Sequence, residues 1–274
     1  MYNLKMDIEF NNGNPVVRLR AFRAIDDRAS CELFVEGHKR VLTSIGVEKV
    51  TSSNNEWMDN PAAFVMIVES LDKQSVYGGA RIHVAGGSEP LPIEQATGAL
   101  DPSIYDLVWQ YAQKGTGEGC GLWNSREIAG YGIGSIFLTR VGVAMSKQIG
   151  LDSLFGLCAP YTVKMAQSVG YEIEYGIGNN GTFYYPKLDL VATVLILRDL
   201  EKLSAADGEN KGAIMSLREN LKGVRIEELR NKKIEIHYDI EIPNMDKWDL
   251  QATISNAKKL TSTKSIDEQH INLL

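Results

Sequence analysis

The sequence feature that most constrains the fold is a run of three alternating glycines between a strand pattern and a helix pattern. Gly130, Gly132 and Gly134 follow the segment LWNSREI and lead into SIFLTRVGVAMSKQI. Glycine adopts positive φ readily and lets another group approach the main chain without meeting a Cβ atom. The first turn of a helix also carries unpaired N–H groups and a partial positive charge, which suits a phosphate. The run therefore predicts either an anion-binding strand-to-helix turn or a tight turn with nothing bound.

Nucleotide-binding motifs do not explain this turn. A dinucleotide fingerprint needs GxGxxG in a βαβ frame, whereas the spacing here is GxGxG with Ser135 next. The phosphate loop of ATPases needs a Gly-Lys-Ser/Thr sequence, which this segment lacks. From Ser135 to Ile149 the apolar residues recur at helical spacing along one face, so we expect an amphipathic helix after the turn.

The rest of the first 200 residues predicts helices and strands around one mixed sheet. Apolar residues spaced by three and four indicate a helix, and short apolar runs between turn residues indicate strands. Residues 115–121, GTGEGCG, are expected to be flexible. The order predicts an α+β fold with a mixed sheet. The expected helices are 16–50, 103–113, 135–149 and 161–169, and the expected strands are 62–70, 75–86, 122–128, 153–158, 171–177 and 190–197.

The character of the chain changes near Asp199. Residues 200–274 are more charged, with a helix pattern in KGAIMSLRENLKGV and a strand pattern in KKIEIHYDIEI, followed by a polar end. We therefore divide the chain into a main domain, 1–199, and an appendage or small second domain, 200–274, of unknown role. The closing thirty residues are expected to be partly mobile.

Charge and cysteine content exclude several classes of protein. The net charge of −6 argues against a general nucleic-acid binder, which usually carries a basic surplus. Cys31, Cys120 and Cys158 are far apart and form no CxxC or Cys/His ligand spacing, so we expect no metal site and reduced thiols in a cytoplasm. The apolar run at 190–197 is too short to span a bilayer and reads as a buried strand.

The glycine turn resembles the acyl-CoA-binding turn of the GCN5-related N-acetyltransferase (GNAT) superfamily, whose motif is Arg/Gln-x-x-Gly-x-Gly/Ala. The segment Ala129–Gly134 meets both glycine positions, with Ala129 where Arg or Gln usually stands. Downstream, Gly170 and Tyr171 match the end of the superfamily's Tyr-x-x-Gly-Phe motif, whose tyrosine often protonates the departing thiolate, and Gln167 replaces that tyrosine. The resemblance covers residues 15–200 and implies a GNAT-like acyl-CoA N-acyltransferase fold.

Within that superfamily the chain resembles the acyl-homoserine-lactone synthases and the long-chain N-acyl amino acid synthases. Ser125 and Arg126 match the end of their Glu-x-Ser-Arg pattern, and Arg81 matches the arginine of the preceding strand. Glu56 and Asp59 resemble the acidic pair before their second strand. Trp123 stands in place of the glutamate that accepts a proton from the amine, which puts the catalytic base in question.

Residue chemistry leaves two readings of these positions open. Arg81 and Arg126 on neighbouring strands could converge, with Glu56 and Asp59 as acidic partners, and bind an amino acid carboxylate. The same four residues could equally form a structural ion-pair network. Glu127 lies four residues after Trp123, so in a continuing strand it would share the same face and could act as the base. It could also be a solvated charge.

The resemblance implies transfer of an acyl group from acyl-CoA or an acyl carrier protein to the amine of a small molecule such as an amino acid. The alternative is a non-catalytic acyl-thioester-binding protein that kept the fold. On the enzyme hypothesis the sites fall into three groups. The catalytic group is Glu127, Arg126 and Tyr131; the carrier-binding group is Ile128, Ala129, Gly130, Gly132, Gly134 and Ser135; the acceptor-binding group is Arg81, Glu56, Asp59 and Trp123.

Overall fold

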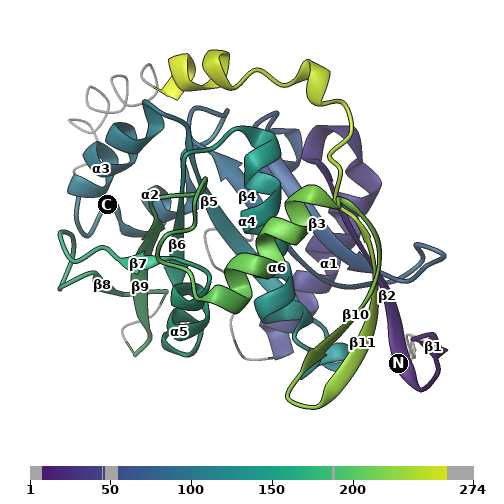
Figure 1. The fold of residues 1–274 in the computed structure, drawn as a ribbon. Helices are drawn as coiled ribbons and strands as arrows, with labels where there is room; N and C mark the ends of the chain where they lie inside the picture. The colour runs from purple at the N-terminus through teal and green to yellow at the C-terminus, as the bar shows by residue number, and fades with distance from the viewer. Residues whose placement is uncertain (1–7, 45, 47–54, 187–188, 258–274) are drawn as a thin grey trace.

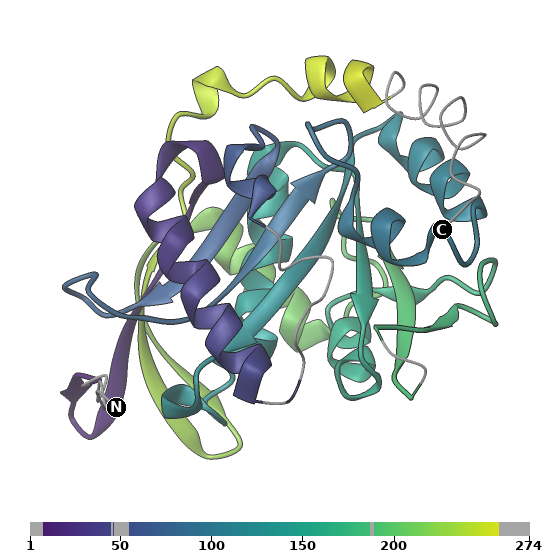
Figure 2. The same ribbon diagram turned by 180° about the vertical axis from the view of Figure 1, so that it is seen from behind.

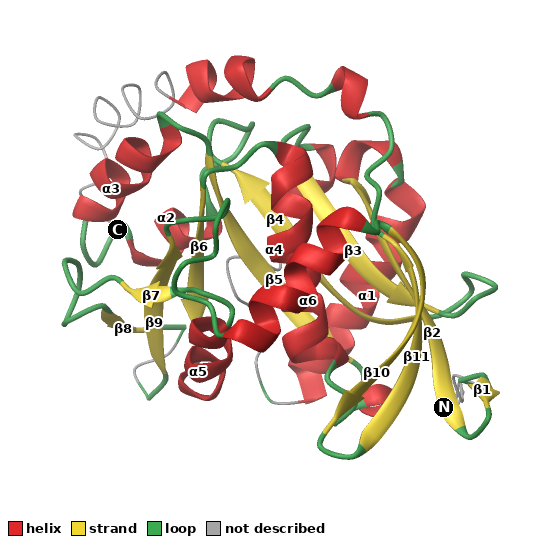
Figure 3. Ribbon diagram, in the orientation of Figure 1, coloured by secondary structure: helices red, strands yellow, loops and turns green. Residues whose placement is uncertain are grey.

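The computed structural model describes residues 8–44, 46, 55–186 and 189–257 of the chain. Within these ranges the strands form one 11-stranded mixed sheet in the order β10-β11-β2-β3-β4-β5-β6-β9-β7, with β1 beside β2 and β8 beside β9 (Figures 1 and 3). Helices cover both faces of the sheet. This arrangement confirms the predicted α+β fold class with a mixed sheet flanked by helices.

The first long element corrects the predicted helix at 16–50. Asn14–Arg23 is a strand, β2, and the helix α1 begins only at Arg28 and ends at Ser44. Both faces of β2 are covered, so its apolar residues follow one another closely and imitate helical spacing. Asp27 sets the start of α1, because its carboxylate accepts a hydrogen bond from the Ser30 N–H at 3.1 Å.

The centre of the sheet is an antiparallel meander. The strands β3, Ala63–Glu69, and β4, Val76–Val84, confirm the predicted pair at 62–70 and 75–86. The next strand, β5, covers Thr116–Asn124 and pairs with β4. The glycine-rich segment expected to be flexible is therefore the first part of a central strand. The predicted strand at 122–128 is wrong beyond Asn124, because a short 3-10 turn occupies Arg126–Ile128.

The pairing between β5 and β6, Ser153–Cys158, is parallel and short. It joins Thr116–Glu118 to Ser153–Phe155 and goes no further. Beyond Glu118 the two strands diverge, although β5 still pairs with β4 and β6 still pairs with β9, Val191–Leu197. Among the described residues, the facing backbone edges of Gly119–Asn124 and Gly156–Cys158 thus have no strand neighbour. We call this opening the β5–β6 seam.

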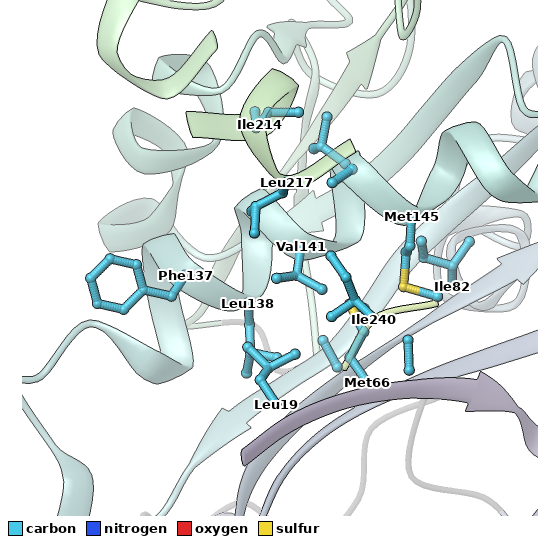
Figure 4. Packing of buried hydrophobic residues seen from close by; sticks show 14 of the residues in the cluster. Leu19, Met66, Ile82, Phe137, Leu138, Val141, Met145, Ile214, Leu217 and Ile240 are labelled. Carbon is cyan, nitrogen blue, oxygen red and sulfur yellow. The ribbon is translucent and has the colours of Figure 1, made fainter. Parts of the chain in front are cut away.

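Two helices pack on the front of the sheet and one crosses its back. After the glycine turn the chain makes a wide π-turn at Ile133–Phe137 and then the helix α4, Leu138–Ile149, beside which lies α6, Gly208–Glu219. Figure 4 shows the side chains that α4 and α6 bury against the sheet, among them Leu138, Val141 and Leu217. The helix α1 packs on the opposite face, as the view from behind shows (Figure 2).

The remaining elements lie around this centre. The helices α2, α3 and α5 connect the strands of the half of the sheet that contains β6. The small strands β7 and β8 pair with β9. Their bounds are α2 Pro92–Thr97, α3 Ser103–Ala112, α5 Pro160–Ser168, β1 Phe10–Asn11, β7 Glu172–Ile173 and β8 Thr182–Tyr184.

Residues after 200, expected as an appendage, extend the same sheet. The strands β10, Lys222–Leu229, and β11, Lys232–Asp239, form a hairpin, and β11 pairs in parallel with β2. Ile234, Ile236 and Ile240 are buried in the main core. The chain then crosses the top of the molecule as a strap, residues 240–257 (Figure 1). Part of the end expected to be mobile, 258–274, lies outside the described residues.

Candidate functional site

A cavity of about 470 Å³ occupies the β5–β6 seam. It is lined from both faces of the sheet, by His38 of α1 on one side and by Leu138 and Thr139 of α4 on the other. Divergent strands therefore open a passage through the middle of the sheet. This size lies within the range of cavities that hold small ligands, roughly 300–1,000 Å³.

Two glycines on opposite strands border the seam. A Cβ atom at Gly119 would lie 3.5 Å from the Tyr171 hydroxyl oxygen, and one at Gly156 would lie 3.6 Å from a ring carbon of the same tyrosine. These are ordinary contact distances, and neither glycine has positive φ. Among the described residues, no neighbouring group would clash with a Cβ atom at either position. The two glycines therefore leave space in the seam that a ligand could fill.

Glu118 is the last β5 residue paired to β6, and its carboxyl group lies against the cavity. The residue is only 2% exposed. Its Oε2 atom accepts a hydrogen bond from the Ile93 N–H at 2.7 Å, and no Lys or Arg nitrogen in the described residues lies within ion-pair distance. Burial raises the pKa of the Glu118 carboxyl to about 8, although the Ile93 N–H and the charge of Arg81 oppose the rise. A carboxyl with such a pKa exchanges its proton near neutral pH.

Arg81 lies on the same side of the sheet as Glu118, opposite Cys120 in the β4–β5 register. It is fully buried and lines the cavity, and its guanidinium carbon stands 4.1 Å from the centroid of the Trp57 ring. Burial lowers the pKa of Arg81 from its usual value. Cys120 beside it stays a thiol, because burial raises the pKa of that group to about 12. This side of the cavity thus combines one buried cation with one titratable acid.

The other side of the cavity holds a buried phenol. Tyr171 is 8% exposed, lines the cavity and lies beside both bordering glycines. Burial raises the pKa of Tyr171, and the nearby Cys158 and Glu118 raise it further, so the hydroxyl keeps its proton. The surrounding surface is mostly apolar. Its side chains are Met66, Ile82, Leu138, Val143, Leu154, Leu157, Met165 and Ala166.

The glycine turn adjoins the cavity only through its end. Gly134 lines the cavity, and its missing Cβ leaves room for the Asn124 amide. Gly132 has φ of +85°, and a Cβ there would lie 2.7 Å from Phe137 and 3.1 Å from Leu229. Gly130, also at +85°, has the Lys232 Nζ at 3.1 Å from its Cβ position. Close packing of protein groups, including the tip of the β10–β11 hairpin, therefore accounts for these glycines.

Several amides of the turn are engaged internally. The N–H groups of Ala129 and Tyr131 donate to Arg126 and Ile128, and those of Ser135 and Phe137 donate to the Gly132 carbonyl. In the part of the chain that the structure describes, the N–H groups of Gly130 and Gly132 donate no hydrogen bond. Ile128 is fully buried in the core, and Ala129 is exposed. The turn thus offers a carrier fewer donors than the sequence suggests.

The expected catalytic trio does not meet in the cavity. Arg126 and Glu127 are both exposed, in the short 3-10 turn that follows β5. The strand ends at Asn124, so the alternation that would carry Glu127 into the cleft does not apply. Tyr131 is half-buried, with the Lys232 Nζ 4.9 Å from its ring centroid, and it does not line the cavity.

The expected acceptor-binding group is divided. Arg81 and Trp123 line the cavity, whereas Glu56 and Asp59, in the 3-10 turn Glu56–Asp59, do not line it. Asp59 pairs with Arg28 at 2.6 Å and is exposed. Trp123 is only 4% exposed and packs between Phe34 and the His38 ring, with which it stacks at 6.3 Å. Arg81 and Arg126 do not converge.

Sequence reasoning missed Glu118 and Tyr171. The signal for Glu118 was present, because an acidic residue alternates with glycines in TGEGCG, a pattern that a central strand tolerates where a ligand approaches. Tyr171 was noted only as a motif match. Among the described residues, no group of three or more His, Cys, Asp or Glu side chains is placed to hold a metal ion. No helix in the same residues is long and apolar enough to cross a membrane.

No family model matches the sequence, and no curated protein matches it. Solved structures do match. An N-acyl amino acid synthase from uncultured soil microbes, FeeM, is 16% identical over 69% of this chain and 94% of its own, with a TM-score of 0.49. The CoA-dependent acyl-homoserine lactone synthase BjaI is 9% identical over 88% and 98%, with a TM-score of 0.48. A spermidine N-acetyltransferase chimera from Vibrio cholerae, SpeG, is 13% identical over 68% and 97%, with a TM-score of 0.43. These proteins are of the kinds that the sequence resemblance indicates.

Proposed function

We propose that the protein is an N-acyltransferase that moves an acyl group from a thioester to the amine of a small molecule within the β5–β6 seam. The observation that carries the proposal is the buried Glu118 carboxyl at the point where the two strands part. A titratable acid, a buried phenol and open backbone edges meet there around one cavity. These are the groups that aminolysis of a thioester needs.

The donor arm fits the open edges of the seam. A pantetheine arm carries two amide groups, which can pair with unpaired strand N–H and C=O groups in the manner of an added strand. The N–H groups of Gly119–Asn124 that face the seam are candidates to stabilise the negative charge on the thioester oxygen in the transition state. The acyl chain would lie on the apolar wall between the sheet and α4.

Two groups are suited to move the protons. The Glu118 carboxylate accepts a proton from the neutral amine as its nitrogen bonds to the carbonyl carbon. The carbon–sulfur bond then breaks, and the Tyr171 hydroxyl donates a proton to the departing thiolate, which leaves as a thiol. Tyr171 recovers its proton from Glu118 through solvent in the cavity. No covalent enzyme intermediate is needed. Glu118 serves as the base, which Trp123, in place of the glutamate of the resembling synthases, cannot do.

The acceptor side favours an amine that carries an anionic group. Arg81 brings a buried positive charge to the same side of the cavity as Glu118. A guanidinium group binds a carboxylate in a fork geometry, so an amino acid would place its amine toward Glu118 and its carboxylate toward Arg81. We therefore propose an amino acid or a similar zwitterionic amine as acceptor.

We propose that the glycine turn binds the phosphates of the carrier through a small number of groups. The N–H groups of Gly130 and Gly132 and the Lys232 ammonium beside them supply two donors and one positive charge. Either CoA or an acyl carrier protein could present phosphates there. Since such thioesters are made in the cytoplasm and the three cysteines are free, we propose a cytoplasmic enzyme.

The test follows free thiol release from a panel of acyl-CoAs and acyl carrier proteins with amino acids and other amines. We expect turnover with at least one pair, and Glu118→Gln should lower it by about 10²–10⁴-fold while the folded state persists. Glu127→Gln is the comparison that separates the two candidate carboxylates. A loss with Glu127→Gln and none with Glu118→Gln would move the base to the exposed turn. Tight thioester binding without turnover on any pair would instead favour an acyl-binding protein.

A further inference from the structure

A second groove lies apart from the seam, between the strap and the main sheet. It has a volume of about 540 Å³. One wall is the strap with Lys247, Trp248 and Thr253, and the other is formed by Arg23 at the end of β2 and by the Gly86–Ser88 turn after β4. We call this space the strap groove. None of its lining residues borders the cavity in the seam.

The walls of the strap groove are held in place by specific contacts. The Trp248 indole N–H donates to the Ile149 carbonyl at 2.9 Å, and its ring meets Phe64 edge-on at 5.0 Å. On the other wall, the Asn60 side chain accepts a hydrogen bond from the Ser88 N–H at 3.3 Å. Gly86, at φ of +98°, lets the turn approach the Thr253 carbonyl closely. The groove is thus a formed site rather than a loose gap.

Arg23 is the unusual residue of this site. It is only 4% exposed, yet no carboxylate in the described residues lies within ion-pair distance of it. One of its terminal nitrogens, Nη2, donates to the Pro61 carbonyl at 3.3 Å, and its Nε is buried with no hydrogen-bond partner in that part of the chain. A guanidinium group withdrawn from water without a counter-ion is costly.

The other charges of the groove do not neutralise Arg23. Lys247 adds a second positive charge. Asp249 supplies one negative charge, but its carboxylate accepts a hydrogen bond from the Ala252 N–H at 3.0 Å and so caps the helical turn that follows. The lining therefore carries one net positive charge. The Trp248 ring, whose centroid is 5.9 Å from the Arg23 guanidinium carbon, adds a flat apolar surface.

We propose that the strap groove binds a small organic anion. Its acidic group, a phosphate or a carboxylate, bonds to the Arg23 guanidinium, and its apolar or planar body lies against Trp248. Such a ligand supplies the counter-ion that Arg23 lacks, and a fork-shaped guanidinium is suited to either acidic group. The site is separate from acyl transfer in the seam, so it stands whether or not that function holds.

The test is calorimetric binding of three probes of similar shape: phenyl phosphate, benzoate and the neutral benzyl alcohol. We expect saturable binding of at least one anion and none of the alcohol. Phosphate without benzoate binding identifies a phosphate ester as the ligand class, and the reverse identifies a carboxylate. Absence of saturable binding by both anions overturns the proposal.

Variants then locate the binding. Arg23→Gln should lower the affinity for the anion by about tenfold or more. Arg23→Lys, which keeps the charge but loses the fork-shaped group, should lower it by less. Arg40→Gln, on an exposed face of α1, is the matched control and should leave affinity unchanged. Lys247→Gln removes the second positive charge of the groove at an exposed position, so it should fold normally and bind the anion more weakly. It therefore tests the proposal even if Arg23→Gln unfolds. The proposal is overturned if anion affinity is unchanged both in Lys247→Gln and in an Arg23 variant that folds. It is also overturned if Arg40→Gln loses as much affinity as the Arg23 variants.

Discussion

Two buried glutamates in neighbouring parts of the sheet show how different partners give one residue type two uses. Glu69 ends β3 and is 1% exposed, and Glu118 lies in β5 and is 2% exposed. Glu69 receives the Arg20 guanidinium, with Nε at 3.0 Å from Oε1 and Nη2 at 3.3 Å from Oε2. Within the described part of the chain, the Glu118 carboxyl accepts one hydrogen bond, from a backbone N–H, and it faces a cavity.

The difference separates a structural charge from a chemical one. The charge of Glu69 is compensated by Arg20, so this pair ties β2 to β3. The Glu118 carboxyl has no such compensation, and the resulting shift of its pKa to about 8 makes it able to take and release a proton. Burial alone does not distinguish the two residues. Their nearest partners do.

The largest expected effect comes from breaking the compensated pair. Glu69→Gln takes from Arg20 the more buried of its two carboxylate partners, the other being Asp27 at 2.9 Å, so we expect a loss of about 3–4 kcal/mol in the free energy of unfolding. Urea denaturation at pH 6 measures it. Glu118→Gln, the same change at the other site, should cost less than about 1 kcal/mol at that pH, because the wild-type carboxyl is already neutral. Equal losses would contradict the contrast between the two residues.

The next effect is a pH dependence that belongs to Glu118. Its folded-state pKa lies above the unfolded value, so the stability it contributes is complete below about pH 4.5 and is lost as pH rises to about 8. We expect wild type to lose about 3 kcal/mol relative to Glu118→Gln between pH 6 and pH 9, and no further difference above that range. Chemical denaturation of both proteins from pH 5 to 9 provides the comparison. A constant difference between them would mean that Glu118 is ionised throughout.

The smallest effect on stability is expected where the seam is widest. Gly119→Ala and Gly156→Ala add a methyl group at ordinary contact distance from Tyr171, so unfolding free energies should change by about 0.5 kcal/mol or less. Because that methyl group occupies the seam, thioester affinity should fall by about tenfold. Gly117→Ala is the matched contrast, since its Cβ would lie 2.6 Å from the His83 carbonyl and should destabilise the fold. Unchanged thioester affinity in both seam variants would place the donor elsewhere.

The sequence predicted the strands and helices whose patterns are local. Short apolar runs between turn residues were sufficient for β3, β4 and β6, and apolar residues spaced by three and four were sufficient for the helices α3 and α5. It was wrong for β2, because burial on both faces leaves apolar residues at intervals that imitate helical spacing. It was also wrong for the start of β5, where glycines that usually indicate a flexible loop instead leave room at the seam.

The candidate site was harder to predict, because it depends on which residues the fold brings together. Arg81 and Trp123 were found through the family resemblance and do line the cavity. Glu118 acquires its properties only from burial and from the divergence of two strands, neither of which a sequence pattern records. Likewise, the packing of Leu229 and Lys232 against the glycine turn joins segments far apart in the chain, and the sequence gives no sign of it.

The parallel pairing of β11 with β2 has a consequence for how the molecule is made. Arg18 and Asp239, which form an ion pair across these strands, are 221 residues apart in the chain. During synthesis the outer edge of β2 stays uncovered until β11 has left the ribosome, and an exposed strand edge invites association with other chains. Products that stop short of β11 should therefore aggregate, so the synthesis of β11 is itself the step that protects the edge of β2.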